Sequence, residues 1–440
     1  MIRMRSLSDS LACVQHYAFP GRQTALFLPP FDPGMIGHMM FPTTARPAVS
    51  ALRSSRIREV ANAGIGRADV LAFWFGESDE VTPDHIRLAG VAALQAGDTF
   101  YRHNLGILEL REALARYQTR LHRRGKAEPI RAESIAVTNS GMSALMIAMQ
   151  ALISPGDRVV VVTPVWPNLV ETPRILGAQV HTESLVADAK GWQLDLDSLL
   201  AALTPDTRML VINSPANPTG WTMSREDQRV VLEHCRRLGI WILSDDAYAR
   251  LYFDGKAQAE GGFRCAPSFL DLAEPEDRLL SANTFSKTWR MTGWRLGWIT
   301  APAELMQSLG TLIEYNTSCA PGFVQQAGLA ALADGDADVE AALGRLAQSR
   351  DFLVRGLNSL PGIQCPNPPG AMYAFFRIAG ITDSLQLCKT LVTEHGLGLA
   401  PGSAFGDQAE GWIRWCFATS ADRLALGLER LREALSAQNR

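Results

Sequence analysis

Short β-rich runs alternate with longer amphipathic segments through the middle of the chain, and this alternation restricts the fold more than any other feature. The strand-like runs are residues 134–138, 158–163, 179–181, 208–212, 240–243, 279–282 and 296–300. The helix-like segments are residues 143–152, 168–176, 197–203 and 225–238, and Ser224 fits the N-cap of the last of them. Alternating strands and helices are typical of a mostly parallel sheet with helices on both faces. We therefore expect a three-layer αβα domain.

The two ends of the chain follow different patterns. Beyond Pro302 long helical patterns precede strand-like runs at 371–376 and 412–417 and a final helix from about Asp422. This order predicts a second, smaller α+β unit. Residues 1–44 mix proline and glycine with isolated apolar residues and follow neither the helical nor the strand period, which predicts an irregular N-terminal extension.

Composition narrows the classes of partner. The 440 residues are 47% hydrophobic, and 42 basic residues against 45 acidic ones leave a net charge of −3. This balance favours neither nucleic acid nor an anionic membrane surface as a partner. No apolar run approaches the roughly 20 residues needed to span a bilayer. Seven scattered cysteines without a C-x-x-C pair indicate a reduced, cytoplasmic protein and predict no metal site.

Polar residues follow three of the strand-like runs. Asn213 begins the segment Asn-Ser-Pro-Ala-Asn-Pro-Thr-Gly after one run, Ser244-Asp245-Asp246 follows the next, and Asn283 begins Asn-Thr-Phe-Ser-Lys after the third. Ligands of open α/β sheets bind outside the carboxyl ends of the strands. We therefore expect these side chains to converge on one ligand site.

Lysine usage directs attention to one position within these segments. The chain has only five lysines: Lys126, Lys190, Lys256, Lys287 and Lys389. Three of them stand next to glycine in turn-like sequences, and the last lies in an amphipathic pattern. A lone lysine is usually a surface residue, but Lys287 directly follows a buried strand. Lys287 is therefore the candidate catalytic lysine.

Several motifs together resemble one family. Ser286-Lys287 followed by Gly-Trp-Arg-Leu-Gly around Arg295, together with Asn-Pro-Thr-Gly and Asp-x-x-Tyr upstream, is similar to the class I/II aminotransferases of fold type I. The resemblance runs from about Arg46 to Leu431. It implies a large domain of residues 85–315 that binds pyridoxal 5′-phosphate, and a small domain assembled from residues 45–84 and 316–440.

The resemblance also implies how the cofactor ring is held. Lys287 would carry the cofactor as a Schiff base, and Asp245 would pair with the ring nitrogen and favour its protonated form. Either Asp245 or Asp246 suits a helix N-cap, but the spacing to Tyr248 favours Asp245 for the ring. Tyr248 and Asn217 would hydrogen-bond the phenolic oxygen of the ring. Trp166, within Pro-Val-Trp-Pro-Asn, would stack on its face.

A second group of residues is implied for the cofactor phosphate. The run from Thr138 to Ala144 joins a strand to a helix, whose N-terminal N–H groups suit a dianion. Met142 departs from the small polar residue that many relatives have in this run, so its contribution is expected from the backbone. Tyr101, in Tyr-x-x-x-x-Gly, resembles a tyrosine that the neighbouring subunit donates. The implied phosphate ligands are Ser140, Gly141, Met142, Thr284, Ser286, Arg295 and Tyr101.

The substrate needs a group that binds its α-carboxylate. Arg414, in Trp-Ile-Arg-Trp, matches the arginine that does so in the family, and a guanidinium is suited to a two-point contact with a carboxylate. Gly76 matches a glycine whose backbone lies against the same carboxylate. Trp166 and Asn217 are expected to contact the substrate as well as the cofactor.

The resulting hypothesis is an aminotransferase that moves an amino group between an amino acid and a 2-oxo acid. Catalysis is assigned to Lys287, Asp245 and Tyr248, and a homodimer with shared active sites is expected. A β-eliminating carbon–sulfur lyase on the same fold remains the alternative, because the same residues serve any reaction that begins at Cα. A transcription regulator is disfavoured because the N-terminal extension shows no helix-turn-helix pattern.

Overall fold

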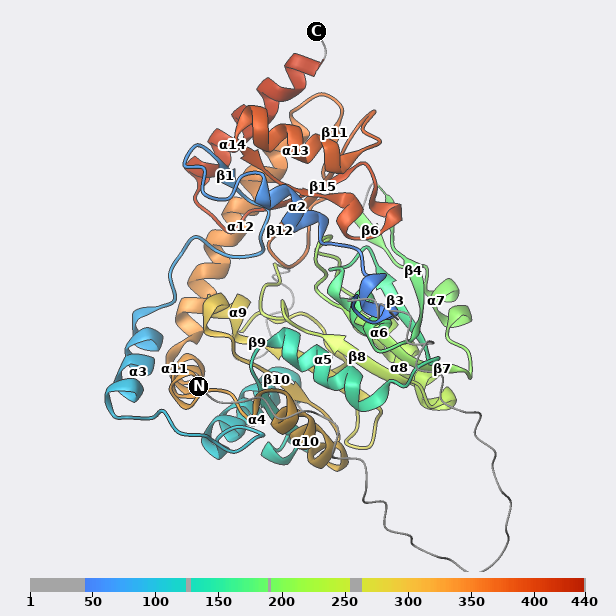
Figure 1. Ribbon diagram of the computed structural model, residues 1–440, viewed down its shortest axis with the longest axis vertical. Coiled ribbons are helices and arrows are strands. Elements are labelled where there is room, and N and C mark those ends of the chain that lie inside the picture. Colours follow the sequence, from blue (N-terminus) through green and yellow to red (C-terminus); the bar gives the residue numbers. More distant parts are fainter. Residues whose placement is uncertain (1–43, 124–127, 189–190, 254–262, 439–440) are drawn as a thin grey trace, which may run out of the picture. The chain divides into compact units, whose positions relative to one another are not determined.

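The structure is a computed structural model that describes residues 44–123, 128–188, 191–253 and 263–438. Residues Arg46–Arg440 form one compact unit, built around one large sheet and one smaller sheet (Figure 1). The part of the predicted N-terminal extension before Thr44 lies outside the described residues. The predicted boundaries between large and small domains stay a prediction.

The large sheet has seven strands in the order β2-β10-β9-β8-β7-β3-β4. Their bounds are β2 (Ile135–Thr138), β3 (Arg158–Thr163), β4 (Gln179–Ser184), β7 (Thr207–Asn213), β8 (Trp241–Asp245), β9 (Leu279–Thr284) and β10 (Gly297–Thr300). All neighbours are parallel except β10, which is antiparallel to both β2 and β9. The sheet is therefore mostly parallel, as the sequence predicts.

Helices cover both faces of this sheet. One face packs against α5 (Gly141–Leu152) and α10 (Met306–Thr317), and the other packs against α4 (Leu108–His122) and α8 (Arg225–Leu238). Successive side chains of a strand point to opposite faces. Along β7, Met209 and Val211 accordingly pack on the α5 side, while Leu210 and Ile212 pack on the α8 side. Buried strands of this kind read as continuous apolar runs, which made them visible in the sequence.

A smaller antiparallel sheet stands beside the large one in Figure 1 and consists of β11 (Ile363–Gln364), β12 (Tyr373–Ile378), β15 (Trp412–Cys416) and β14 (Ala400–Pro401). The parallel pair β1 (Leu71–Ala72) and β13 (Leu397–Gly398) joins the N-terminal part of the unit to its C-terminal part. The other helices are α1 (Pro47–Ser50), α2 (Arg56–Asn62), α3 (Asp84–Gln95), α6 (Asn168–Ile175), α7 (Leu196–Ala202), α9 (Phe285–Thr288), α11 (Gly322–Asp334), α12 (Asp336–Asn358), α13 (Ser384–His395) and α14 (Ala421–Gln438).

The expected α/β class with a smaller α+β part is confirmed, and the differences lie at element ends. The first turn of α5 begins at Gly141, two residues before the expected start, because Ser140 caps it by accepting a hydrogen bond from the Ser143 N–H at 3.0 Å. The predicted N-cap at Ser224 is confirmed, because the Ser224 hydroxyl accepts a hydrogen bond from the Asp227 N–H at 3.0 Å. The strand expected from residue 371 begins at Tyr373, because Ala371 has a φ of 60° and cannot continue a strand.

The antiparallel pair of β5 (Val186–Asp188) and β6 (Gly191–Gln193) was not expected from the sequence. None of the helices within the described residues is long and apolar enough to cross a membrane.

Candidate active site

A cavity of about 570 Å³ lies at the carboxyl ends of β7, β8 and β9. These strands are neighbours, and their last residues, Asn213, Asp245 and Thr284, all line the cavity. The Asn213 amide holds the loop after β7 in place, because it donates to the Asp245 carbonyl at 3.0 Å and accepts from the Asn217 N–H at 2.7 Å. The expected convergence of polar groups at this sheet edge is therefore observed.

Most of the site residues expected from the sequence lie in the wall of this one cavity. Ser140 directly precedes the wall residue Gly141, and Tyr101 lies outside the wall. The expected residues in the wall are Gly76, Gly141, Met142, Trp166, Asn217, Asp245, Tyr248, Thr284, Ser286, Lys287, Arg295 and Arg414.

Lys287 occupies the single turn of α9, whose N-cap is Thr284. Its Nζ donates a hydrogen bond to the Gly76 carbonyl and lies 5.9 Å from the centre of the Tyr248 ring. The pKa of the Lys287 amine is lowered to about 8, mainly by burial and also by the charge of nearby Arg414, against the opposing effect of Cys416. A substantial fraction of this amine is therefore neutral, and hence nucleophilic, near physiological pH.

Asp245 and Asp246 are adjacent in the chain but face different surroundings. Asp246 accepts hydrogen bonds from the hydroxyls of Ser244 and Ser281, each at 2.6 Å, and Ser268 at 3.1 Å. Asp245 lines the cavity, where its carboxylate accepts from the Ala247 N–H at 3.2 Å. The geometry therefore leaves Asp245, and not Asp246, available to a ligand.

The electrostatics of Asp245 reflect this position. Burial raises the pKa of its carboxyl to about 7, with a further contribution from the charge of Asp246 and opposing ones from the Ala247 N–H and Lys287. A buried carboxylate of this kind is stabilised by a cationic partner. A protonated ring nitrogen in the cavity would be such a partner.

Arg414, on β15, reaches the cavity from the smaller sheet. Its guanidinium donates to the Asn217 side-chain oxygen at 2.9 Å and to the Trp74 carbonyl, and its Cζ lies 4.5 Å from the centre of the Tyr373 ring. Arg414 is 2% exposed, and no carboxylate contacts it among the described residues. A ligand carboxylate would therefore supply its missing counter-charge.

Tyr373 is a cavity residue that the sequence reasoning missed. Its hydroxyl lies 2.7 Å from the Tyr248 hydroxyl, and burial raises the pKa of Tyr373 to about 12 and that of Tyr248 well above its usual value. Both phenols are thus protonated at neutral pH. Tyr373 also explains Gly76, since a Cβ on that glycine would lie 1.9 Å from the Tyr373 hydroxyl. The motif Gly-Ala-Met-Tyr at the start of β12 was visible in the sequence, but nothing local linked it to residues more than a hundred positions away.

The N-terminus of α5 and the loop at β9 form an anion cradle. A Cβ on Gly141 would lie 3.0 Å from the Thr284 side chain, and one on Gly297 would lie 2.6 Å from the Gly141 nitrogen. Glycine at these two positions therefore lets β9 and β10 lie close against the start of α5. Thr284 donates to the Ser286 hydroxyl at 2.9 Å, and the exposed Arg295 side chain reaches the same wall. Main-chain N–H groups, hydroxyls and a guanidinium suit a phosphate.

Tyr101 lies apart from the cavity of its own chain. It is 87% exposed, and other large apolar side chains are exposed in α3, in the loop that follows it, at the start of α4 and in α10. These residues are Leu88, Val91, Leu94, Phe100, Leu108 and Tyr315. Large apolar side chains exposed in this number are candidates for a protein interface.

The fold and the site together define an α/β enzyme whose lysine, buried carboxylate and arginine surround one cavity at the carboxyl edge of the sheet. The family model for aminotransferase class I and II matches residues 70–431. Among curated proteins, an aspartate aminotransferase of Pyrococcus horikoshii is 32% identical over 394 residues, which cover 89% of this chain and 97% of that protein. A probable N-acetyl-LL-diaminopimelate aminotransferase of Bacillus subtilis is 31% identical, with 88% of this chain and 94% of that protein covered.

A solved structure agrees with these relatives. An aspartate aminotransferase single mutant from Thermus thermophilus superposes with a TM-score of 0.81 at 30% identity, covering 89% of this chain and 99% of that one. The chain belongs to the class I and II aminotransferase family. It is an aminotransferase, which moves an amino group between an amino acid and a 2-oxo acid, and the relatives give no support to the lyase alternative.

Proposed function

We propose that this aminotransferase holds pyridoxal 5′-phosphate on Lys287 and works in the cytoplasm as a homodimer. The observation that carries the proposal is the placement of a half-buried lysine of lowered pKa and a buried carboxylate of raised pKa in the wall of the same cavity. The donor set fits the cofactor, since a cationic ring nitrogen would pair with Asp245 and the phosphate would fill the cradle at α5. When bound, the cofactor supplies an aldehyde that condenses with amines and a ring that withdraws electrons from the carbon bearing the amino group.

Lys287 has two tasks in this proposal. Its neutral amine, favoured by the pKa of about 8, is the nucleophile that holds the cofactor. With the cofactor and an amino acid bound, the Lys287 Nζ would take the proton from the substrate Cα and would return a proton as a general acid. A cationic ring nitrogen beside Asp245 would favour its ionised carboxylate.

The ring is positioned by a hydroxyl, an amide and an aromatic face. Tyr248 stays protonated because burial raises its pKa, so its hydroxyl can donate to the ring oxygen, and the Asn217 amide can donate beside it. Tyr373 orients the Tyr248 hydroxyl through their 2.7 Å contact. Trp166 offers a flat apolar surface to the ring.

We assign the phosphate and the substrate carboxylate to different groups of residues in the cavity wall. The Gly141 and Met142 N–H groups and the Ser140, Thr284 and Ser286 hydroxyls are assigned to the phosphate, with Arg295 completing its charge. Arg414, Asn217 and the backbone of Gly76 are assigned to the substrate α-carboxylate. Arg414 already contacts Asn217, which aligns its planar donors for a two-point contact.

The homodimer rests on Tyr101 and on the other exposed large apolar side chains. We assign Tyr101 to the phosphate of the partner subunit, which makes each active site dependent on both chains. The cytoplasmic location rests on the cysteines: within the described residues, Cys235, Cys319, Cys365, Cys388 and Cys416 are buried thiols that form no disulfide.

The test is a half-reaction with the purified protein loaded with pyridoxal phosphate. Addition of an amino donor should discharge the absorbance of the Lys287-bound cofactor and release one 2-oxo acid per site, and a second 2-oxo acid should restore the spectrum. Lys287→Ala should retain the cofactor only without a covalent bond and should show no turnover. Release of ammonia and pyruvate from a cysteine-type substrate, without restoration by a 2-oxo acid, would contradict transfer.

A further inference from the structure

A second cavity of about 430 Å³ adjoins the active-site cavity. Ser55, Met142 and Asn168 line both, so the two spaces meet at these three side chains. The Asn168 amide donates to the Met142 sulfur at 3.3 Å, which joins two of them into one wall. The second cavity therefore lies next to the one that Arg414 lines.

Three segments that are distant in the sequence supply most of the lining of the second cavity. They are residues 52–56 at the start of α2, residues 163–175 from the end of β3 through α6, and residues 403–408 before β15. Met142 and Met146 of α5 and Thr182 of β4 complete it. Much of its lining is apolar: Leu52, Met142, Met146, Val165, Val170, Ile175 and Phe405. An apolar lining favours an apolar ligand stem.

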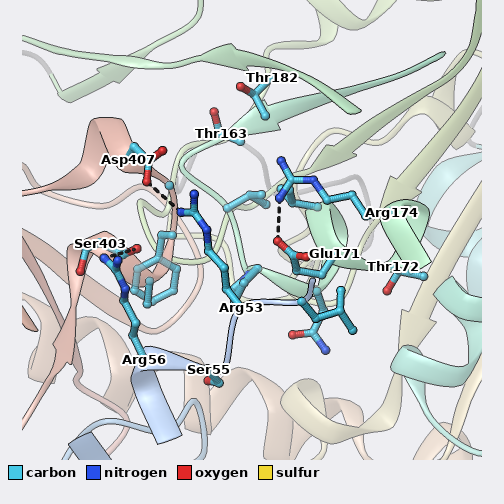
Figure 2. Close-up of a pocket in the computed structure, with 18 of the residues that line it drawn as sticks. Arg53, Ser55, Arg56, Thr163, Glu171, Thr172, Arg174, Thr182, Ser403 and Asp407 are labelled. Atoms are coloured by element: carbon cyan, nitrogen blue, oxygen red, sulfur yellow. Dashed lines mark hydrogen bonds and ion pairs between the residues drawn. The ribbon is translucent and has the colours of Figure 1, made fainter. Parts of the chain in front are cut away.

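Charged side chains also line the second cavity (Figure 2). Two of its three arginines form ion pairs within the described residues, and the third does not. Arg53 contacts Asp407 at 3.2 Å, and Arg174 contacts Glu171 at 2.7 Å. Arg56 is partly buried and donates only a long hydrogen bond of 3.4 Å to the Ser403 carbonyl; it forms no ion pair with the carboxylates in the described part of the chain.

A guanidinium carries five N–H donors, so most of those of Arg56 remain for a ligand. The charges around the cavity sum to one excess positive charge, which resides on Arg56. An anionic ligand group is therefore favoured at this position, and the apolar lining lies between it and the active-site wall.

We propose that the second cavity receives the side chain of the amino-acid substrate, and that this side chain has an apolar stem longer than that of aspartate and ends in a carboxylate bound by Arg56. The proposal rests on the proposed function, because Arg414 must hold the α-carboxylate for the side chain to enter past Met142. Arg56 lines only the second cavity and Arg414 only the first, so a side chain that starts from Arg414 must leave the first cavity to reach Arg56.

The experiment uses the protein loaded with pyridoxal phosphate and linear dicarboxylic acids of about four to eight carbons, which have no amino group and bind without reacting. Isothermal titration calorimetry measures their affinities. A longer acid should bind about 10-fold or more tightly than the four-carbon acid, as expected for one added charge-assisted contact and extra buried methylenes. Affinity that is highest for the four-carbon acid would overturn the proposal.

Two variants assign the effect to Arg56. Arg56→Gln should weaken the long acid by about 10-fold to 100-fold and leave the four-carbon acid within about twofold. Arg53→Gln is the matched comparison, since its guanidinium is paired with Asp407 and 69% exposed, and it should weaken the long acid by less than about threefold. Equal losses in the two variants would overturn the assignment to Arg56.

A third variant keeps the proposal testable if Arg56→Gln folds poorly. Val170→Phe fills part of the second cavity with a larger side chain and leaves Arg414 and Lys287 unchanged. It should selectively weaken binding of the long acid. Unchanged binding of the long acid would contradict entry into this space. The proposed function fails separately, by absence of a Lys287-bound chromophore or of 2-oxo acid formation. Transfer from short donors without a preference for longer acids would overturn only the inference about the second cavity.

Discussion

Asp245→Asn separates the electrostatic effect of this residue on the cofactor-free fold from its effect on catalysis. Burial raises the pKa of Asp245 from its usual 3.8 to about 7. The folded state therefore binds more protons than the unfolded state between these values, and the free energy of unfolding falls as pH rises from about 4 to about 7. At 1.36 kcal/mol per pKa unit, the charged carboxylate destabilises the cofactor-free fold by up to about 4 kcal/mol above pH 7.

An amide at this position has no such dependence on pH and can still accept the Ala247 N–H. Cofactor-free Asp245→Asn should therefore be more stable than the parent, and its advantage should be about 2 kcal/mol larger at about pH 7.5 than at about pH 5. Urea-unfolding midpoints at the two pH values measure this difference. Asp197→Asn, at an exposed position in α7, is the matched control and should show little change.

The same substitution should have the opposite consequence once the cofactor is bound. Without the carboxylate the ring nitrogen loses its partner, and amino-group transfer should slow by about 100-fold or more, as for loss of one positioned acid–base group. A stability advantage that does not change with pH would refute the electrostatic reasoning. Single-turnover rates close to those of the parent would refute Asp245 as the ring partner.

Three further substitutions test other parts of the site. Gly76→Ala should destabilise the fold by about 1–3 kcal/mol, because its Cβ would lie 1.9 Å from the Tyr373 hydroxyl, and thermal melting should show partial rescue when Tyr373→Phe is added. Tyr373→Phe alone should cost about 1 kcal/mol and shift the pH profile of transfer, since the Tyr248 hydroxyl loses its 2.7 Å partner; an unchanged profile would count against that role. Mixing inactive Tyr101→Arg and Lys287→Ala chains should restore activity through hybrid dimers, and absence of recovery despite demonstrated subunit exchange would contradict shared sites.

The fold was predictable where a pattern is local and periodic. The expected bounds of β3 and α8 agree with Arg158–Thr163 and Arg225–Leu238, because a buried parallel strand is continuously apolar and a covering helix is amphipathic. β9 extends two residues beyond its expected end, since the polar Thr284 pairs with Gly297 of β10. The last residues of β9 are polar because they line the site, so the hydrophobic pattern alone underestimates the length of this strand.

The candidate site was predictable to the extent that its residues follow strands in short motifs. Asp245 and Lys287 end or follow neighbouring strands, so the parallel topology brings them to one cavity. Tyr373 and Arg56 were not predictable, because their positions depend on how segments far apart in the chain pack around the cavities. The sequence shows which functional groups such residues have, but it does not show which distant residues they contact.

The proposed activity depends most directly on Lys287, and one measurement tests this role. The protein is loaded with pyridoxal phosphate, treated with sodium borohydride to make the bond between cofactor and amine permanent, digested, and mapped by mass spectrometry. We expect a single stoichiometric modification, on Lys287. A stoichiometric modification on Lys126, Lys190, Lys256 or Lys389, with Lys287 unmodified, would contradict it.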